Sequence, residues 1–228
     1  MEEVLATYER PLRAEEPVVC LDERPVQLTA DTRPPTRARP GRQARYDYEY
    51  KRHGTANLFC AVEPKAGWHL VRATPNRTGP EFAKVIRAIT AHYPAADTIH
   101  LVMDNLSTHT RKSLTDYYGQ EAGGALWDRL TVHYTPKHAS WLNQGEIAIG
   151  LLARECLGRR RIADLPSLRS ETRAWTRRAN RQRRIIQWRF TRRKARKVFG
   201  YRCPGHTMSQ SGCTRHHQPK PISSRSED

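Results

Sequence analysis

Carboxylates follow apolar runs at two places in the chain and lie within a helical pattern at a third. Asp22 follows the run at 18–21, and Asp104 follows the run at 99–103. Glu146 lies in a segment whose apolar residues recur at helical spacing. Carboxylates left at strand ends and brought together by a fold can hold two Mg²⁺ ions, which activate and stabilise oxygens in phosphoryl transfer. The expected substrate is therefore a nucleic acid.

Each of these acids also has an ordinary structural explanation when it is taken alone. Asp104 and Asn105 suit the cap of a turn or helix that follows a strand. Asp22 and Glu23 are neighbours on one strand, so their side chains point to opposite faces and cannot both reach one metal. We assign Asp22 to the metal and expect Glu23 to support the site indirectly.

Four segments surround these acids and occur in a fixed order. They read CLDE at 20–23, YEYKRHGTANLF at 48–59, MDNLSTH at 103–109 and TPKHASWLNQ at 135–144. In these segments the chain resembles the DDE transposases of bacterial insertion sequences in the mariner-type superfamily. The resemblance extends from about residue 18 to residue 201 and covers the catalytic domain of that family only.

The resemblance implies an enzyme that hydrolyses a phosphodiester at the element ends and directs the freed 3′-hydroxyl to target DNA. Asp22, Asp104 and Glu146 would be the catalytic residues and would hold two Mg²⁺ ions, with Mn²⁺ as an alternative. His109 would approach the scissile phosphate or orient Asp104, and Asn143 would touch a metal-bound water or DNA. The residues expected to support the site are Glu23, Asn105, His109 and Asn143.

Positive charge is concentrated in one part of the chain. The formal net charge of the 228 residues is +17, and residues 154–202 hold 18 Lys or Arg against three acids. A basic segment beside a nearly neutral core favours binding of a phosphate backbone, because neutralised phosphates release counterions. A solvated helix face is the alternative. The residues expected to contact DNA are Arg52, His53, Lys137, Arg177, Arg178, Arg181, Arg183 and Arg184.

The patterns of apolar and turn residues predict an α/β protein with an RNase H-like fold, in which helices flank a mixed five-stranded sheet. We expect a basic helical C-terminal extension, with its helix at about 166–184, and a loop insertion at 118–129. The expected strands are 17–22, 57–63, 68–74, 98–104 and 130–134. The expected core helices are 78–92, capped by Thr78, then 108–118, and one that begins near 141.

These elements define an expected division of the chain. Residues 1–16 form a lead-in, 17–158 the catalytic core, 159–202 the basic helical segment and 203–228 a disordered tail. The resembling proteins carry helix-turn-helix domains ahead of the core, whereas 21 residues precede Asp22 here. We therefore expect a separately encoded N-terminal helix-turn-helix half as a partner.

DNA, as element ends and as target, is the main expected partner, and a homodimer is expected on it. No apolar stretch has the length of a membrane span, and the N-terminus is acidic. We therefore expect a cytoplasmic, nucleoid-associated protein without a membrane partner.

Two other functions remain open at this level. They are a non-catalytic DNA-binding remnant of a transposase and a structure-selective nuclease on the same fold. Gly145 and Gly150 bracket Glu146 in the expected helix, where each costs up to about 1 kcal/mol relative to Ala. These two glycines predict a less rigid active site or a degenerating copy of the gene.

Overall fold

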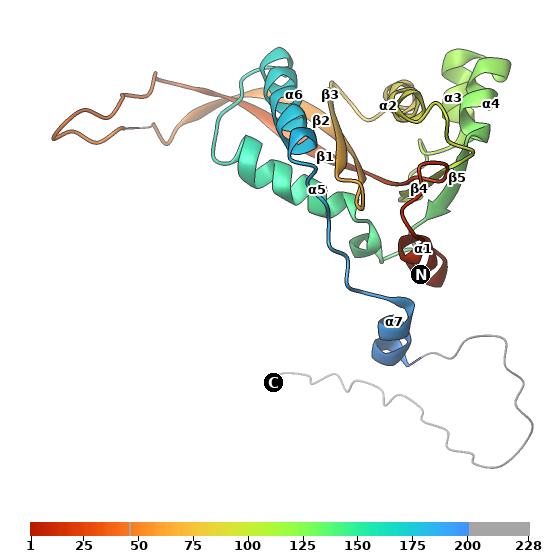
Figure 1. Cartoon of the computed structure of the whole chain (residues 1–228). Helices are drawn as coiled ribbons and strands as arrows, with labels where there is room; N and C mark the ends of the chain where they lie inside the picture. The colour runs from red at the N-terminus through yellow and green to blue at the C-terminus, as the bar shows by residue number, and fades with distance from the viewer. Residues whose placement is uncertain (46, 201–228) are drawn as a thin grey trace, which may run out of the picture. The chain divides into compact units, whose positions relative to one another are not determined.

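A single mixed sheet organises the chain in the computed structural model, which describes residues 1–45 and 47–200 (Figure 1). Its strands lie in the order β3-β2-β1-β4-β5, with antiparallel pairing of β1 to β2 and β2 to β3. Strands β4 and β5 continue the sheet in parallel with β1. This is the RNase H-like arrangement that the sequence predicts. The strands are β1 (Val18–Asp31), β2 (Tyr50–Glu63), β3 (Trp68–Thr74), β4 (Ile99–Met103) and β5 (Leu130–Tyr134).

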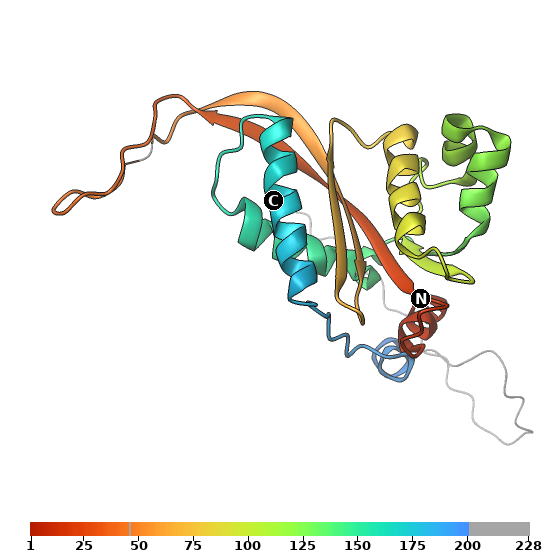
Figure 2. The same ribbon diagram turned by 45° about the horizontal axis from the view of Figure 1, so that its top comes forward.

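Helices cover both faces of this sheet, which explains why its central strands read as continuous apolar runs. Figure 2 shows α2 (Gly79–His92), α3 (Arg111–Tyr118) and α4 (Gln120–Asp128) on one face. The opposite face carries α5 (Gly145–Leu152) and α6 (Leu165–Arg181). Alternate residues of a strand serve the two cores: on β2, Phe59 packs towards α2, whereas Cys60 packs towards α5 and α6.

Smaller elements complete the described residues. Helix α1 (Glu2–Glu9) precedes the sheet, a 3₁₀ turn at Ser140–Leu142 precedes α5, and a π-helical turn at Ala153–Leu157 follows it. The chain divides into two compact units, Met1–Arg192 and Arg193–Asp228, and α7 (Arg192–Phe199) begins at their boundary. The expected disordered tail at 203–228 lies outside the described residues. Among the residues that are described, no helix is both long and apolar enough to cross a membrane.

The first two strands are longer than the sequence predicts. Residues 24–31 pair with 50–58 and form a ribbon that leaves the sheet (Figure 1). Leu28 and Ala56 are buried in the core beside α5 and α6, so side-chain packing supports the base of the ribbon. Residues 50–55 are exposed, and there the sequence carries no apolar pattern that predicts a strand.

The expected loop insertion at 118–129 is wrong, because it contains α4. Gly123 and Gly124 read as breakers in the sequence, but a Cβ at Gly123 would overlap the backbone carbonyl of Leu114. The glycine therefore allows α3 and α4 to pack closely. The expected side-chain cap at Thr78 is also wrong: its hydroxyl donates to Asn76 Oδ1 at 2.7 Å and makes no bond to the helix.

Helix α6 is held to the sheet by one apolar face. Its N-cap Asp164 accepts a hydrogen bond from the Ser167 N–H at 2.7 Å. Leu168 and Trp175 are buried against the sheet, and Trp175 Nε1 donates to Glu155 Oε2 at 2.9 Å. The helix ends before the expected residue 184, because the chain then turns to bind the β2–β3 turn, where Ile186 N–H donates to the carbonyl of Pro64 at 2.8 Å.

Replacing Trp175 by Ala should lower the free energy of unfolding by about 3–5 kcal/mol, since it leaves a cavity under α6 and removes the partner of Glu155. Urea denaturation followed by circular dichroism measures the effect. Ser170→Ala, an exposed position on the same helix, is the control and should change stability by less than about 0.5 kcal/mol. Equal effects of the two changes would contradict this account of how α6 is held.

Candidate active site

Two of the predicted carboxylates lie side by side because their strands are parallel neighbours. Cys20 on β1 is in register with Val102 on β4, and continuing that register by two residues places Asp22 beside Asp104. Asp104 follows the last residue of β4, with half of its side chain exposed. Glu146 is exposed in the first turn of α5. The three carboxylates thus come from three separate elements.

Asp22 and Glu23 point to opposite faces of β1, as expected from their adjacent positions. Asp22 faces α5, where a Cβ added at Gly145 would lie 2.7 Å from the Asp22 Cβ. Glu23 faces the α2 side, and its Oε1 lies 2.7 Å from His109 Nε2. Only Asp22 therefore shares a face with α5 and Glu146.

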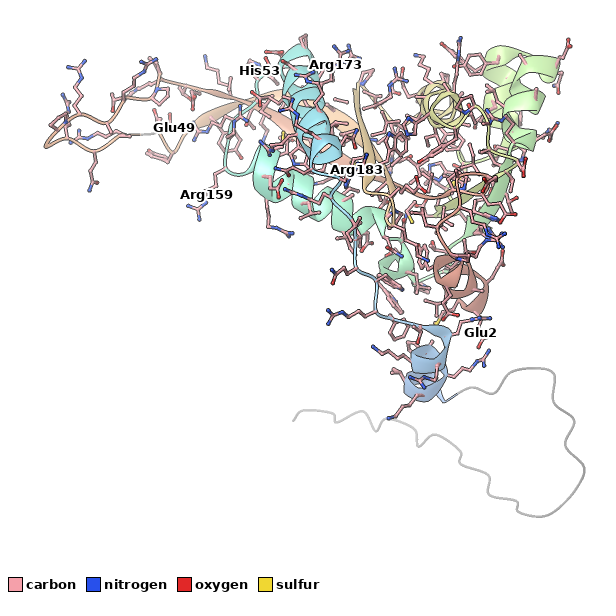
Figure 3. The ribbon with its side chains drawn as sticks, in the orientation of Figure 1. Glu2, Glu49, His53, Arg159, Arg173 and Arg183 are labelled. Carbon is pink, nitrogen blue, oxygen red and sulfur yellow. The ribbon has the colours of Figure 1, made fainter. Side chains whose placement is uncertain are left out.

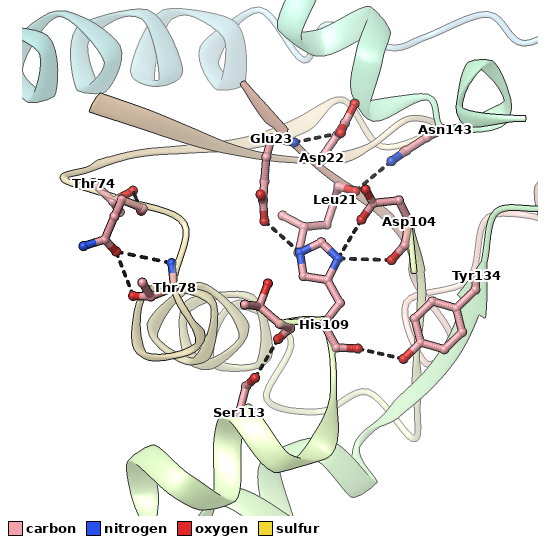
Figure 4. Close-up of polar contacts among 12 residues, drawn as sticks. Leu21, Asp22, Glu23, Thr74, Thr78, Asp104, His109, Ser113, Tyr134 and Asn143 are labelled. Carbon is pink, nitrogen blue, oxygen red and sulfur yellow. Dashed lines mark hydrogen bonds and ion pairs between the residues drawn. The ribbon is translucent and has the colours of Figure 1, made fainter. Parts of the chain in front are cut away.

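His109 joins Glu23 to Asp104 (Figure 4). Its Nδ1 lies 2.8 Å from Asp104 Oδ1, and its ring stacks on Phe82. Burial alone would lower the pKa of this imidazole, but its hydrogen bonds to Asp104 and Glu23 raise the pKa to about 9. The protonated ring donates to both carboxylates, and it holds the pKa of Asp104 below its usual range.

The burial of His109 favours one of the two roles predicted for it. Its side chain is 1 % exposed, and its contact with Asp104 supports orientation of that carboxylate rather than contact with the scissile phosphate. Its neighbour in the same segment, Asn105, is exposed.

Asn143 ties the start of α5 to β1. Its Nδ2 donates to the carbonyl of Leu21 at 2.8 Å, and its Oδ1 accepts from the Gly145 N–H at 3.0 Å. The side chain is 2 % exposed. Both ends of its amide are hydrogen-bonded within the protein, and contact of Asn143 with a metal-bound water or DNA stays a prediction. Asn143 positions the helix that carries Glu146.

Tyr8 is a positioning residue that the sequence did not reveal. Its buried hydroxyl donates to the carbonyl of Leu142 at 2.8 Å and accepts from the Gln144 N–H at 3.4 Å. The same oxygen lies 3.4 Å from Cys20 Sγ on β1. One hydroxyl therefore joins β1 to the segment before α5. The sequence carries no signal for this contact, since Tyr8 lies far from its partners along the chain.

The carboxylates act on one another through their charges. Burial raises the pKa of Asp22 to about 7, and the charges of Glu146, Asp104 and Glu23 add to the rise. The N–H of Glu23, which donates to Asp22 Oδ1 at 2.8 Å, partly opposes this shift. A cation between these groups would remove the repulsion.

The donor set suits a divalent metal ion of the Mg²⁺ class, which prefers carboxylate oxygens. Within residues 1–45 and 47–200, no three His, Cys, Asp or Glu side chains are yet grouped closely enough to hold a metal. Asp104 is held by His109, whereas the side chain of Glu146 is exposed.

The basic residues expected to contact DNA are distributed over several surfaces. Arg178 and Arg184 both form ion pairs with Glu155, whose single carboxylate offsets one of their two charges. The Nδ1 of His53 lies 3.1 Å from the carbonyl of Ala163. Exposed side chains without such a partner among the described residues are Arg52, Lys137, Arg177, Arg181 and Arg183.

Replacing Gly145 by Ala should destabilise the protein by about 1–3 kcal/mol, because the new methyl group would force β1 and α5 apart. Gly150→Ala is the matched control in the same helix. Its Cβ would meet only Arg154 Nη1, at 3.5 Å, so the change should stabilise the protein by up to about 1 kcal/mol. Urea denaturation measures both, and equal effects would refute the close approach at Gly145.

Comparison with known proteins gives one family and a group of solved structures. The sequence matches the family described as DDE superfamily endonuclease over residues 17–169. None of the curated proteins matches the chain significantly. The structure is similar to "Mos1 transposase paired-end complex with left transposon end", with 14% identity, a TM-score of 0.49, and 80% of this chain and 56% of that chain covered.

Two further structures are similar to the chain. "Crystal structure of the Mos1 Strand Transfer Complex" shares 16% identity at a TM-score of 0.45, and the match covers 77% of this chain and 51% of that chain. The catalytic core domain of BIV integrase shares 16% identity at a TM-score of 0.33, with 51% of this chain and 73% of that chain covered. The chain spans about half the length of the Mos1 chains that it matches.

Proposed function

Since the chain belongs to the DDE superfamily of endonucleases, we propose that it is the catalytic domain of a transposase that cleaves DNA strands and joins them to target DNA with divalent metal ions. The observation that carries this proposal is the parallel pairing of β1 with β4, which places Asp22 beside Asp104, together with the close approach to Asp22 of the helix that carries Glu146. The charges of Asp104 and Glu146 raise the pKa of Asp22, which supports a shared metal site. The element would be an insertion sequence.

Asp22, Asp104 and Glu146 are the residues that would hold two ions, Mg²⁺ or Mn²⁺. When bound, the ions supply Lewis acidity to the attacking and leaving oxygens of a phosphodiester. Asp22 is held in place by the Glu23 N–H, and Asp104 by the His109 imidazolium. The protein thus fixes two ligands in advance and leaves Glu146 to complete the site.

The proposal extends to the partners of the reaction. The similar Mos1 structures are described as a paired-end complex with a transposon end and as a strand transfer complex. These descriptions support element ends and target DNA as the substrates here.

Replacing Asp22 or Asp104 by Asn, or Glu146 by Gln, should lower Mn²⁺- or Mg²⁺-dependent nicking of an element-end duplex by more than about 100-fold. Loss of a residue that only orients a metal ligand already costs about 10–100-fold, and loss of a ligand costs more. Gel analysis of a labelled duplex measures nicking. Asp116→Asn, an exposed acid paired with Lys112, is the control and should remain active.

The products of the same reaction decide between the possible activities. Joining of the labelled strand to a second duplex supports a transposase, whereas nicking without joining would make the chain a nuclease. Full activity in one of the three variants would remove that residue from the site. Inactivity of the folded wild-type chain with both ions would favour a DNA-binding remnant.

Metal binding has a readout that does not need activity. Mn²⁺ should stabilise the wild-type protein by about 2.7 kcal/mol at a concentration 100 times its dissociation constant, because the ion binds only the folded state. Asp22→Asn should lose most of this gain, and Asp116→Asn should keep it. Thermal unfolding with and without Mn²⁺ measures the shift, and an equal shift in all three proteins would place the ion elsewhere.

A further inference from the structure

A basic groove lies along the free edge of the sheet. Strand β3 is the outermost strand on its side, and the groove runs between this strand and helices α2 and α6. We call it the β3-edge groove and define it by its charged residues. These are Arg72, Glu81, Lys84, Arg169, Arg173 and Arg177.

Three arginines of α6 form one side of the β3-edge groove. Arg169, Arg173 and Arg177 are four residues apart, so they lie in a row on one face of the helix, and all are exposed. Arg173 projects from α6 in Figure 3. Like charges at this spacing repel each other and destabilise a helix by about 0.2–0.5 kcal/mol per pair. The row is therefore costly unless an anion binds it.

The charge of this groove is not neutralised within the protein. Arg169 Nε donates to the carbonyl of Ala73 at 3.0 Å, and Arg72 Nη1 donates to the carbonyl of Lys84 at 2.9 Å. These acceptors are uncharged, so they orient the guanidinium groups and leave their charge available. The one carboxylate of the groove, Glu81, is paired with Lys84 at 2.7 Å.

Arginines around the rest of α6 behave differently. Arg178 and Arg184 pair with Glu155, and Arg160 pairs with Glu171. In contrast, Arg173 and Arg177 have no carboxylate partner within the part of the chain that the structure describes. Two unpaired charges of α6 thus face the groove.

The groove leads towards the carboxylates. Thr74, at the end of β3, lines it, and Arg77 follows in the loop between β3 and α2. The charge of Arg77 acts on Asp104. Figure 4 shows that this loop lies beside Glu23 and His109. A strand at the active site can therefore continue into the groove along a basic path.

We propose that the β3-edge groove binds the phosphodiester backbone of duplex DNA next to the scissile bond. The proposal rests on the function proposed above. Four residues of α-helix rise about 6 Å, so the three guanidinium groups are separated and can contact different phosphates of one strand. These contacts position DNA without reading its sequence.

The double variant Arg173→Gln with Arg177→Gln tests the proposal. Losing two phosphate contacts should reduce the slope of log affinity against log salt by about 1.8, since each contact contributes about 0.9. Fluorescence anisotropy with a labelled duplex, at several salt concentrations, measures the slope. Arg173→Lys with Arg177→Lys keeps the charges and should keep the slope.

The matched control is Arg111→Gln with Arg160→Gln. It removes the same charge from two exposed arginines that pair with Asp128 and Glu171. Its salt slope should stay close to that of the wild type, because neither residue lines the groove. An equal loss of slope in the two glutamine variants would overturn the proposal, since net charge alone would then explain it. An unchanged slope in the groove variant would overturn it as well.

Two further readouts separate this proposal from the proposed function. Mn²⁺-dependent nicking by the wild type tests the function, so nicking with an unchanged slope in the groove variant rejects the groove alone. A reduced slope together with no nicking by the wild type supports the groove and rejects the function. If the variant loses binding to a polyglutamate peptide but not to DNA, the groove binds an acidic protein and the proposal fails.

Discussion

Repulsion of Asp22 by the carboxylates of Asp104 and Glu146 is the constraint on which the proposed metal site depends. The protein opposes it with buried contacts between β1 and the segment before α5. Asn143 bonds to the backbone of Leu21, and Tyr8 bonds to both sides of Asn143. Gly145 allows the two backbones to approach. These interactions are made by uncharged groups, so they do not compete with a metal for the carboxylates.

The same strand supports the site from its other face. Because neighbouring residues of β1 point in opposite directions, Asp22 faces α5 while Glu23 faces the helices on the far side. His109 links Glu23 to Asp104, because its two ring nitrogens contact the two carboxylates. A buried positive charge between two acids is a strong reason for Asp104 to keep one orientation. The two faces of one strand thus serve different ligands of the proposed metal site.

Charge on α6 is divided according to the surroundings of each side chain. Arginines near Glu155 and Glu171 are neutralised within the protein and stabilise its packing. Those near the edge strand have uncharged acceptors or none. The total of +17 therefore says less about DNA binding than the position of the few charges that remain unpaired.

The sequence alone determined the fold class and the order of the core elements, because buried strands and helices leave periodic patterns in the chain. Strands 68–74 and 130–134 were predicted with the bounds that the structure shows. The pattern of apolar residues did not predict the exposed residues 50–55 of β2. It also did not predict α4, where the glycines that read as a loop allow close packing against α3.

Only the tertiary structure decided the roles of individual side chains. Gly145 reads as a weakness in a helix and proves to be the point of closest approach to Asp22. Arg177 and Arg178 are neighbours in the sequence, yet one lines a groove and the other pairs with Glu155. Tyr8 acts on residues more than 130 positions away. Such contacts depend on which segments the fold brings together, and local sequence patterns carry no record of them.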